Sequence, residues 1–351
     1  MHLLSHKKIN AGLLGAVVIA AAAIVSVYFG NPAAAPVVLQ LNGETMGTYY
    51  HIKVVGNDFT EAQLESVKRE VEQELKTLNL LMSRYITSSE ISRFNSRKNT
   101  DPVSVSHDLL DVLNFAQALS RKTDGAFDVT VGPLIGLWGF HNQGQLTNTP
   151  STEQIEEAQA VVGYKKLIVD TTEGTIRKIE PALDVDLSSI AKGRGVDQVA
   201  GVLSRQGFAN YMVEIGGEVS CSGMSVRGTP WRVGIEKPVG LKRETMKVVE
   251  LVGKSMATSG DYRSFFKVKG KRYSHTIDPQ TGRPVTHNLA SVSVVHKECM
   301  KADAIATALT VLGPDKGFAL ADRNGWAAFF ITRKKNETFT TRTTKAFAKL
   351  L

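Results

Sequence analysis

The order of the predicted secondary structure constrains the fold of this chain more than any other feature of its sequence. Helical patterns predominate between residues 60 and 165, and short β-rich runs predominate after Lys165. A doubly wound α/β fold would require strands and helices to alternate regularly, and no such alternation is present. The sequence therefore predicts an α+β fold, with mixed or antiparallel sheets and flanking helices.

Five helices are predicted from apolar residues at helical spacing or from N-cap signals. They cover Thr60–Leu81, His107–Lys122, a segment that begins at Ser151, Ser189–Arg205 and Met300–Leu312. Thr60 and Ser151 are each followed by a glutamine three positions later, which is the pattern of a capping box. The last helix is expected to stop at Gly313 and Pro314, because glycine favours a helix end and proline cannot continue the helix.

Seven runs read as extended structure. They are Val37–Val55, Leu167–Asp170, Tyr211–Ile215, Trp231–Ile235, Lys247–Leu251, Phe265–Val268 and Ser291–Val295. No internal repeat, low-complexity tract or second linker divides the chain after the N-terminal region. We therefore expect residues 37–351 to form one compact body with two lobes.

The N-terminus carries a targeting signal. Lys7 and Lys8 precede an uncharged stretch from Ala11 to Gly30, whose length is close to that needed to cross a bilayer. Cationic residues before an apolar span keep the N-terminus in the cytoplasm and send the following chain outward. We predict that residues 1–36 form an uncleaved anchor and linker. A cleaved secretory signal is the alternative, because Ala33-Ala34-Ala35 offers small residues for cleavage.

Charge and cysteine content exclude some functions. The formal net charge is +8, yet no Lys/Arg run and no interleaved basic and aromatic stripe occurs, so nucleic acid is a poor candidate partner. The two cysteines, Cys221 and Cys299, lack the C-x-x-C spacing of a zinc or redox site. We expect both to be small buried residues, and a disulfide between them stays open.

Two early segments are suited to a flat ligand. Met46 lies in Thr45–Thr48, where the glycine indicates either a bend in a strand or a close backbone approach to a ligand. In the second case Met46 would pack on an aromatic face, which suits its polarizable sulfur. Tyr85 follows the end of a helix and either is an ordinary loop residue or stacks on a ring system.

Asp128 follows a turn rich in glycine and aromatic residues. That turn is compatible with a purely structural role, or with Asp128 accepting hydrogen bonds from ligand hydroxyls. The segment Asp186–Gly193 has a clearer logic, since a strand end passes through serines into a helix and leaves backbone N–H groups free for an anion. Lys192 would add positive charge there. Phosphate binding and plain N-capping both fit, and the Walker pattern is absent.

The glycine turns in Glu214–Glu218 and Thr258–Tyr262 are explained by conformation alone. A G-x-G-x-x-G fingerprint is missing, so nicotinamide chemistry on a Rossmann domain has little support. His275 stands between hydroxyl residues, before the stiff turn made by Asp278-Pro279 and Thr281-Gly282. It is either structural or a general base that acts near pH 7.

Asp303 and Thr307 lie four residues apart on a predicted helix and so share one face. A carboxylate and a hydroxyl placed in this way offer hard oxygen ligands for Mg²⁺. The alternative is an aspartate favoured by the helix dipole together with a threonine bonded back to the backbone.

Taken together, these segments resemble the ApbE family of FAD:protein FMN transferases. The pieces that carry the resemblance occur in the family's order: Thr45–Thr48, Ser89–Asn95, Gly125–Asp128, Asp186–Gly193, Glu214–Gly217, Ala257–Tyr262, Ser274–Pro279 and Ala302–Ala304. The resemblance implies a two-lobed α+β fold with FAD in the cleft. By position, the FAD contacts would be Met46, Tyr85, Ala126, Phe127, Asp128, Asp186, Lys192 and Ile277.

The resemblance also implies a metal and a reaction. Mg²⁺ would lie between the backbone carbonyl of Ser189, Asp303 and Thr307, and His275 matches the histidine that the family needs for transfer. An acceptor Thr or Ser hydroxyl would attack the FMN-side phosphorus of FAD and release AMP. His275 is the candidate base, with Asp261 or Asp278 orienting it. Water in place of the acceptor would make the protein an FAD hydrolase, and a carrier that only binds FAD is the third interpretation.

Location and partners follow from the same resemblance. The body would face the periplasm from a bacterial inner membrane and modify exported acceptors that carry a Ser/Thr flavinylation motif. Subunits of sodium-pumping NADH:quinone reductase or Rnf-type complexes are the expected acceptors. The chain lacks the lipid-bearing cysteine of the family's lipoproteins, so the resemblance leaves its mode of attachment open.

Overall fold

A computed structural model of the chain describes residues 36–140, 148–239, 244–260, 265–268, 271–335 and 338–351. Its centre is an antiparallel sheet of eight strands in the order β1-β2-β6-β7-β10-β15-β16-β17. The strands are β1 (Val37–Thr45), β2 (Thr48–Gly56), β6 (Asn210–Ile215), β7 (Glu218–Ser222), β10 (Lys254–Gly260), β15 (Leu289–His296), β16 (Ala327–Arg333) and β17 (Phe339–Thr343). This sheet, with its helices, confirms the predicted α+β class.

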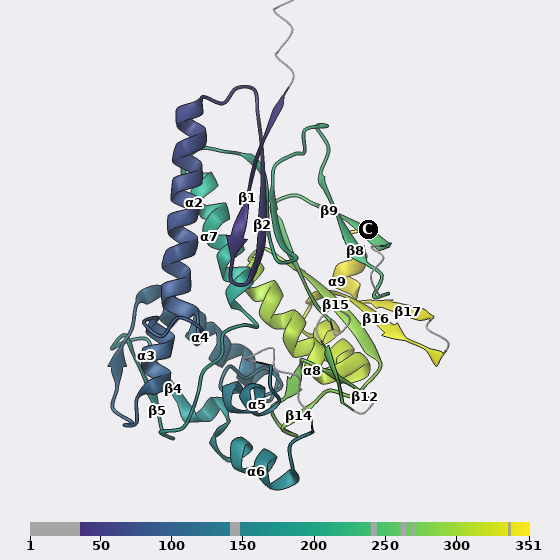
Figure 1. Cartoon of the computed structure of the whole chain (residues 1–351). Helices are drawn as coiled ribbons and strands as arrows, with labels where there is room; N and C mark the ends of the chain where they lie inside the picture. The colour runs from purple at the N-terminus through teal and green to yellow at the C-terminus, as the bar shows by residue number, and fades with distance from the viewer. Residues whose placement is uncertain (1–35, 141–147, 240–243, 261–264, 269–270, 336–337) are drawn as a thin grey trace, which may run out of the picture.

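Both faces of the sheet are covered. The helices α2 (Glu61–Met82), α7 (Ala191–Arg205) and α8 (Cys299–Arg323) pack against it, and a separate ribbon of β8 (Trp231–Glu236) and β9 (Thr245–Leu251) covers the other side (Figure 1). Alternate residues of one strand therefore enter different cores: Phe330 packs with α8, whereas Phe329 packs with the ribbon and α9 (Lys345–Ala348). Burial on both faces explains why β15 is buried without a break from Leu289 to Val295, its two serines included.

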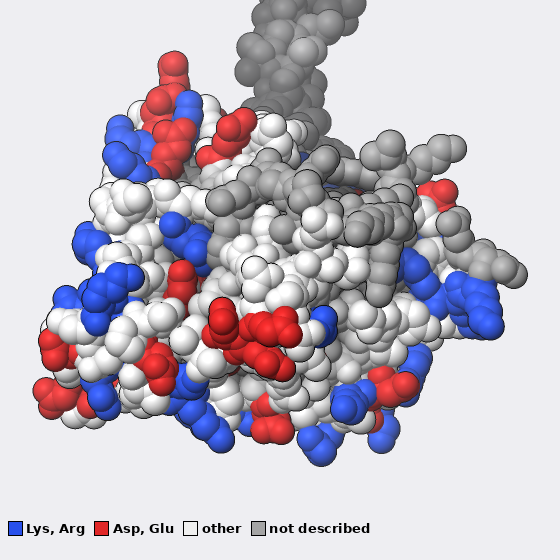
Figure 2. Space-filling model, turned by 60° about the horizontal axis from the view of Figure 1, so that its bottom comes forward, with Lys and Arg blue, Asp and Glu red and all other residues white. Residues whose placement is uncertain are grey.

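A second group of elements lies below the main sheet in Figure 1. It contains α3 (Glu90–Ser96), α4 (His107–Lys122), α5 (Gly132–Leu137), α6 (Thr152–Val161) and a small sheet of β3 (Val103–Ser104), β5 (Thr175–Lys178) and β4 (Leu167–Asp170). Leu109, Leu113 and Leu119 of α4 share one core with α8 residues such as Ala304 and Ile305. On the face in Figure 2, acidic and basic side chains are interspersed, with one compact acidic group near its centre.

Local sequence signals placed most helix starts well. Thr60 and Ser151 both cap their helices, and each forms the predicted box with the glutamine three positions later. The expected helix from Ser189 begins two residues later, at Ala191, and Ser189 itself lies in the preceding turn. Cys221 and Cys299 are buried and unpaired, as expected for small core residues, so no disulfide joins them.

The predicted stop at Gly313 is only partly correct. Gly313 leaves the helical conformation (φ 78°), but a further helical segment follows directly and α8 continues to Arg323. Pro314 has no N–H for the carbonyl of Thr310, and His287 Nε2 instead lies 2.8 Å from that oxygen. A Cβ on Gly313 would come within 2.7 Å of the His287 ring, so glycine is required at this kink.

The predicted membrane anchor lies outside the residues that the structure describes. Among those that are described, no helix combines the length and the apolar character needed to span a bilayer.

Candidate functional site

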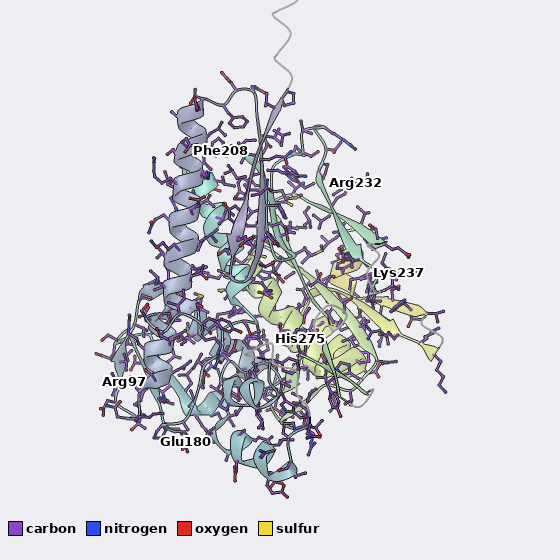
Figure 3. All side chains as sticks on the ribbon, viewed as in Figure 1. Arg97, Glu180, Phe208, Arg232, Lys237 and His275 are labelled. Atoms are coloured by element: carbon purple, nitrogen blue, oxygen red, sulfur yellow. The ribbon has the colours of Figure 1, made fainter. Side chains whose placement is uncertain are left out.

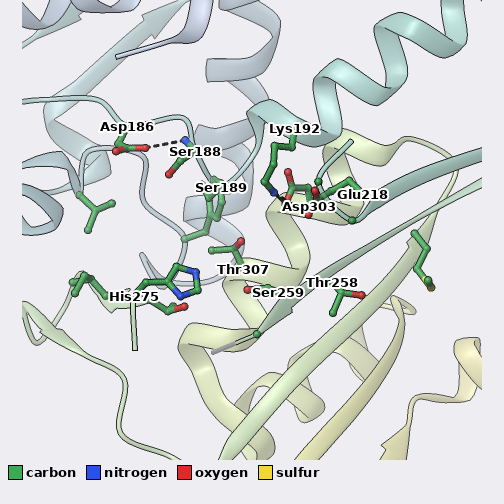
Figure 4. A pocket seen from close by; sticks show the side chains of 18 of the residues that line it. Asp186, Ser188, Ser189, Lys192, Glu218, Thr258, Ser259, His275, Asp303 and Thr307 are labelled. Atoms are coloured by element: carbon green, nitrogen blue, oxygen red, sulfur yellow. Dashed lines mark hydrogen bonds and ion pairs between the residues drawn. The ribbon is translucent and has the colours of Figure 1, made fainter. Parts of the chain in front are cut away.

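A cavity of about 580 Å³ lies where the loops of the main sheet meet the lower group of elements. Ten of the residues predicted for the site line it, and they come from distant parts of the chain: Ala126, Phe127, Asp128, Asp186, Ser189, Lys192, His275, Ile277, Asp303 and Thr307. Figure 3 places His275 near the middle of the molecule, and Figure 4 shows the cavity from close by. The fold thus brings the separate sequence segments to one place.

Met46 and Tyr85 line a neighbouring cavity of about 440 Å³ instead. The two cavities share three lining residues, Asp186, Ser188 and Lys192. Met46 is in the left-handed backbone region (φ 51°) at the turn between β1 and β2. Tyr85 is 70% exposed at the rim. Asp261, predicted to orient His275, lies outside the described residues.

Asp186 is held rigidly at the border between the cavities. Its Oδ1 accepts a hydrogen bond from the backbone N–H of Ser188 (2.8 Å), and its Oδ2 accepts one from Arg84 Nη1 (3.2 Å). Its own N–H donates to the carbonyl of Val129 (2.7 Å). These bonds fix the turn that leads into α7 and so the direction of its first residues.

Lys192, in the first turn of α7, forms an ionic group with two carboxylates. Its Nζ lies 2.9 Å from Glu218 Oε1 and 3.9 Å from Asp303 Oδ1. Burial disfavours the charge on Lys192, but Asp303 and Glu218 outweigh burial and raise the lysine pKa. Burial is also the main reason why the pKa of Glu218 and that of Asp303 are raised, and Lys192 opposes both shifts. The group carries two acidic side chains for one basic one.

Only one of the two carboxylate oxygens of Glu218 is paired within this group. Its side chain is 3% exposed, and Oε2 is buried without a hydrogen-bond partner in the described structure. A buried carboxylate oxygen of this kind is costly unless a proton or a cation compensates it. The surplus of negative charge and the unpartnered oxygen would both be compensated by a proton on Glu218 or by a positively charged ligand in this part of the cavity.

The start of α7 frees a backbone oxygen beside Asp303. In a continuous helix the N–H of Gly193 would donate to the carbonyl of Ser189, four residues back. It donates instead to Asp303 Oδ2 (3.0 Å), so the Ser189 carbonyl lacks that helical partner. Thr307 lies one turn further along α8 and lines the same cavity. The back-bonded threonine of α8 is Thr310, whose Oγ1 donates to the carbonyl of Ala306 (2.9 Å).

His275 is positioned by the turns on both sides of it. Ser274 Oγ accepts a hydrogen bond from the N–H of Thr276 (3.1 Å). Asp278 closes the next turn, because its Oδ1 accepts from the N–H of Gln280 (2.9 Å) and its carbonyl from Gly282 (2.9 Å). Asp278 therefore stiffens its own turn, as the sequence predicted.

In Figure 4, His275 and the Lys192–Glu218–Asp303 group lie on different sides of the cavity, with Ser189, Ser259 and Thr307 between them in this view. An imidazole on one side, and a lysine ammonium with carboxylate and hydroxyl oxygens on the other, suit a reaction at a phosphorus atom, where a proton leaves and negative charge must be stabilised.

Both carboxylate oxygens of Asp128 accept hydrogen bonds from the protein itself. Its Oδ1 accepts from the N–H (2.8 Å) and hydroxyl (2.6 Å) of Thr130, and its Oδ2 accepts from the N–H of Tyr164 (2.7 Å). Burial raises its pKa, and these hydrogen bonds oppose that shift. Asp128 thus holds the cavity wall together, whatever contact it also makes with a ligand.

Sequence reasoning missed Glu218 as a feature of the site, and it missed the bond from the Gly193 N–H to Asp303. Glu218 lies in a turn that the sequence analysis attributed to the conformation of its glycines alone. Its partner Lys192 comes from another element. Among the described residues, no group of three or more His, Cys, Asp or Glu side chains is arranged to hold a metal ion. A metal here would therefore depend on backbone and hydroxyl oxygens as well as carboxylates.

Comparison with known proteins gives a consistent result. The family model described as the ApbE family matches residues 46–330. Two proteins named FAD:protein FMN transferase are each 44% identical to this chain. The one from Haemophilus influenzae aligns over 317 residues, 89% of this chain and 91% of that protein, and the one from Vibrio cholerae over 286 residues, 82% and 85%.

Solved structures show the same fold. The flavin transferase ApbE from Vibrio cholerae superposes with a TM-score of 0.82 at 40% identity, covering 90% of this chain and 100% of that one. The flavinyl transferase ApbE from Pseudomonas stutzeri, in its apo form, gives a TM-score of 0.81 at 41% identity, covering 90% and 97%.

Proposed function

This chain belongs to the ApbE family, and we propose that it transfers FMN from FAD to a Thr or Ser hydroxyl of an acceptor protein. The observation that carries the proposal is the cavity in which His275 and the Lys192–Glu218–Asp303 group are brought together. A protein that only bound FAD would need a shaped pocket, but it would not need a base opposite a charged group.

We propose that FAD spans both cavities. FAD has two ring systems joined through a diphosphate, and the cavities meet at Asp186, Ser188 and Lys192. In this arrangement one ring system occupies each cavity and the diphosphate lies beside Lys192. Met46 and Tyr85 then contact one ring system, while Phe127 and Ile277 contact the other end of the molecule.

The residues present also fit Mg²⁺. Asp303, Thr307 and the carbonyl of Ser189 would hold the ion. The unpartnered Oε2 of Glu218 and the surplus negative charge beside it favour a cation at this point. When bound, Mg²⁺ would neutralise charge on the phosphates and so let a nucleophile approach. It prefers oxygen ligands and usually keeps several waters, which suits a set with few carboxylates.

The chain's own residues supply the rest of the chemistry. The acceptor hydroxyl oxygen forms a bond to the FMN-side phosphorus, and its proton passes to a nitrogen of His275. The bond from this phosphorus to the bridging oxygen breaks, and AMP leaves with that oxygen. Lys192 stabilises the negative charge that develops on the phosphates. FMN remains on the acceptor through a phosphoester.

Location and acceptors belong to the same proposal. The apolar N-terminal stretch supports export, with residues 1–36 as a membrane anchor and the enzyme on the periplasmic side of the inner membrane. Exported subunits of sodium-pumping NADH:quinone reductase or Rnf-type complexes are the acceptors we would test first.

The test incubates the protein with FAD, Mg²⁺ and an exported acceptor domain containing a Ser/Thr flavinylation motif. In-gel flavin fluorescence on the acceptor, with one AMP released per label, is the expected result. AMP and free FMN without a labelled acceptor would instead identify an FAD hydrolase. Tight FAD binding with no AMP released would leave only a carrier and would refute both enzymatic functions.

His275→Ala and Tyr273→Phe make a matched pair for this assay. The first removes the base and should abolish labelling, whereas the second changes a neighbouring ring that packs on Trp138, with centroids 5.8 Å apart, and should leave labelling intact. Loss of labelling in both variants would mean that the whole segment, and not the imidazole, is what matters.

A further inference from the structure

Asp197, on α7, is a half-buried carboxylate that takes no part in the chemistry described above. Its Oδ1 accepts a hydrogen bond from the N–H of Cys299 (2.8 Å), and its Oδ2 accepts one from the N–H of Met300 (2.9 Å). These are the first two amides of α8. The helix's own N-cap residue, Glu298, makes no side-chain cap bond. Asp197 therefore caps α8 from a neighbouring helix.

The preceding turn of α7 contacts the same end of α8. Gly193 lies four residues before Asp197 and so on the same helix face. A Cβ on Gly193 would come within 2.5 Å of the Cys299 carbonyl oxygen, which means that the two backbones touch here. The Gly193 N–H also donates to Asp303 Oδ2 (3.0 Å). Two successive turns of α7 are thus attached to the first turn of α8.

We propose that Asp197 is a positioning residue that fixes α8 against α7 and thereby sets the distance from Asp303 and Thr307 to the Ser189–Lys192 segment. The inference rests on the proposed function, because those groups are the ones assigned to Mg²⁺ and the diphosphate. A carboxylate is suited to this role, since both of its oxygens accept. An amide of the same shape would turn a donor toward one of the two N–H groups.

The negative charge on Asp197 is stabilised mainly by the two amides of α8. Burial is the main reason why its pKa is raised to about 6, and the bonds from Met300 and Cys299 oppose that shift. Arg194, on the same helix, also favours the charged form, but its Nη2 lies 2.6 Å from Asp108 Oδ1. Glu298, next to the capped amides, disfavours it. The two amides of α8 are therefore the direct partners that offset the cost of placing a charge here.

The test compares Asp197→Asn with Asp108→Asn in the full chain. Asp108 Oδ1 accepts from Arg194 Nη2 (2.6 Å) and Gln198 Nε2 (3.4 Å), so its variant loosens α7 without touching α8. Hydrogen exchange measured by mass spectrometry reports on the amides of Cys299–Asp303. Electron paramagnetic resonance with Mn²⁺, an oxygen-preferring stand-in for Mg²⁺, reports on ion binding with FAD present.

We expect Asp197→Asn to speed exchange in Cys299–Asp303 and to weaken Mn²⁺ binding by about ten-fold or more, as for other residues that orient metal ligands. Asp108→Asn should leave both unchanged. Wild-type exchange and Mn²⁺ affinity in Asp197→Asn would overturn the inference, and so would faster exchange with unchanged affinity, because the cap would then be structural only.

Failure of the proposed metal site is separable from failure of this inference. If the wild type binds no Mn²⁺, the metal assignment falls, and the FAD dissociation constant then decides: Asp197→Asn must weaken FAD binding through Lys192 for the inference to stand. If Asp197→Asn does not fold, Asp197→Ser, which keeps one acceptor oxygen, takes its place with the same expected direction in each measurement.

Discussion

Gly193→Ala should destabilise the protein, although the same change usually strengthens a helix. Alanine in a helix interior is favoured over glycine by about 1 kcal/mol. At this position the new Cβ would meet the Cys299 carbonyl oxygen at 2.5 Å, the Cys299 carbonyl carbon at 2.7 Å and the Met300 Cα at 2.7 Å. All three are backbone atoms, so no side-chain rotation can relieve the contact.

The steric effect outweighs the helix propensity. Restoring an ordinary contact of 3.4 Å requires α7 and α8 to move apart by roughly 1 Å, and overpacking of this kind costs about 1–3 kcal/mol. After the gain in propensity is subtracted, we expect a net loss of up to about 2 kcal/mol in the free energy of unfolding. For a body of this size that corresponds to a melting temperature lower by up to roughly 3 °C.

The Gly193→Ala change should reduce activity more than stability. The same displacement stretches the bond from the Gly193 N–H to Asp303 Oδ2, which is now 3.0 Å long, and moves Asp303 away from Lys192. A misplacement of about 1 Å in a catalytic group can reduce the rate by roughly 100-fold. We therefore expect FMN transfer by Gly193→Ala to fall by about that factor at a temperature where the variant is fully folded.

Gly201→Ala is the matched control on the same helix. Its new Cβ would meet only Arg205 Nη1 at 3.3 Å, the end of a movable side chain, so the gain in helix propensity of up to about 1 kcal/mol should prevail. Urea or thermal denaturation of the two variants, together with the transfer assay, tests the reasoning. A Gly193→Ala variant as stable as Gly201→Ala would refute the close approach of α7 and α8.

Three further outcomes are expected. Asp303→Asn keeps the shape of the side chain but removes its charge, and it should abolish Mg²⁺-dependent AMP release; normal release would refute the metal assignment. The pKa of Asp197 is raised to about 6 in the folded protein, so wild-type stability should fall as pH rises from about 4 to about 6, because the folded state then loses protons that the unfolded state has already lost. Asp197→Asn should lack that component in urea titrations. His287→Ala leaves the Thr310 carbonyl at the α8 kink without its partner and should cost about 1–3 kcal/mol, measured against Thr286→Ala at the exposed neighbouring position.

Helix starts were predictable because their signals are local. The capping boxes at Thr60 and Ser151 lie within four residues of chain, and each formed as the pattern requires. The course of α8 was not predictable, because its continuation past Pro314 depends on a partner from another segment. His287 Nε2 lies 2.8 Å from the carbonyl that the proline leaves without a donor, and nothing in the local sequence indicates that contact.

The functional site, too, was predictable from the sequence only in part. Single motifs left Lys192, His275 and Asp303 ambiguous between structural and functional roles, and only the order of several motifs pointed to a family. The fold then placed ten of the predicted residues around one cavity. Met46 and Tyr85 fell in the adjoining one, a division that a list of motifs does not contain.

What the sequence could not supply is the balance of charge. Glu218 gains its importance from Lys192, 2.9 Å away, and from Asp303 on a third element. Each carboxylate alone would be an ordinary partner for one lysine. Because both face the same ammonium in a buried place, one negative charge is left without compensation, and the pKa of each carboxyl rises in consequence of its burial. A cation from outside the chain would relieve both effects at once. The proposal of a metal therefore rests on the three side chains together, and neither the spacing of Asp303 and Thr307 nor the N-terminus of α7 predicts it alone.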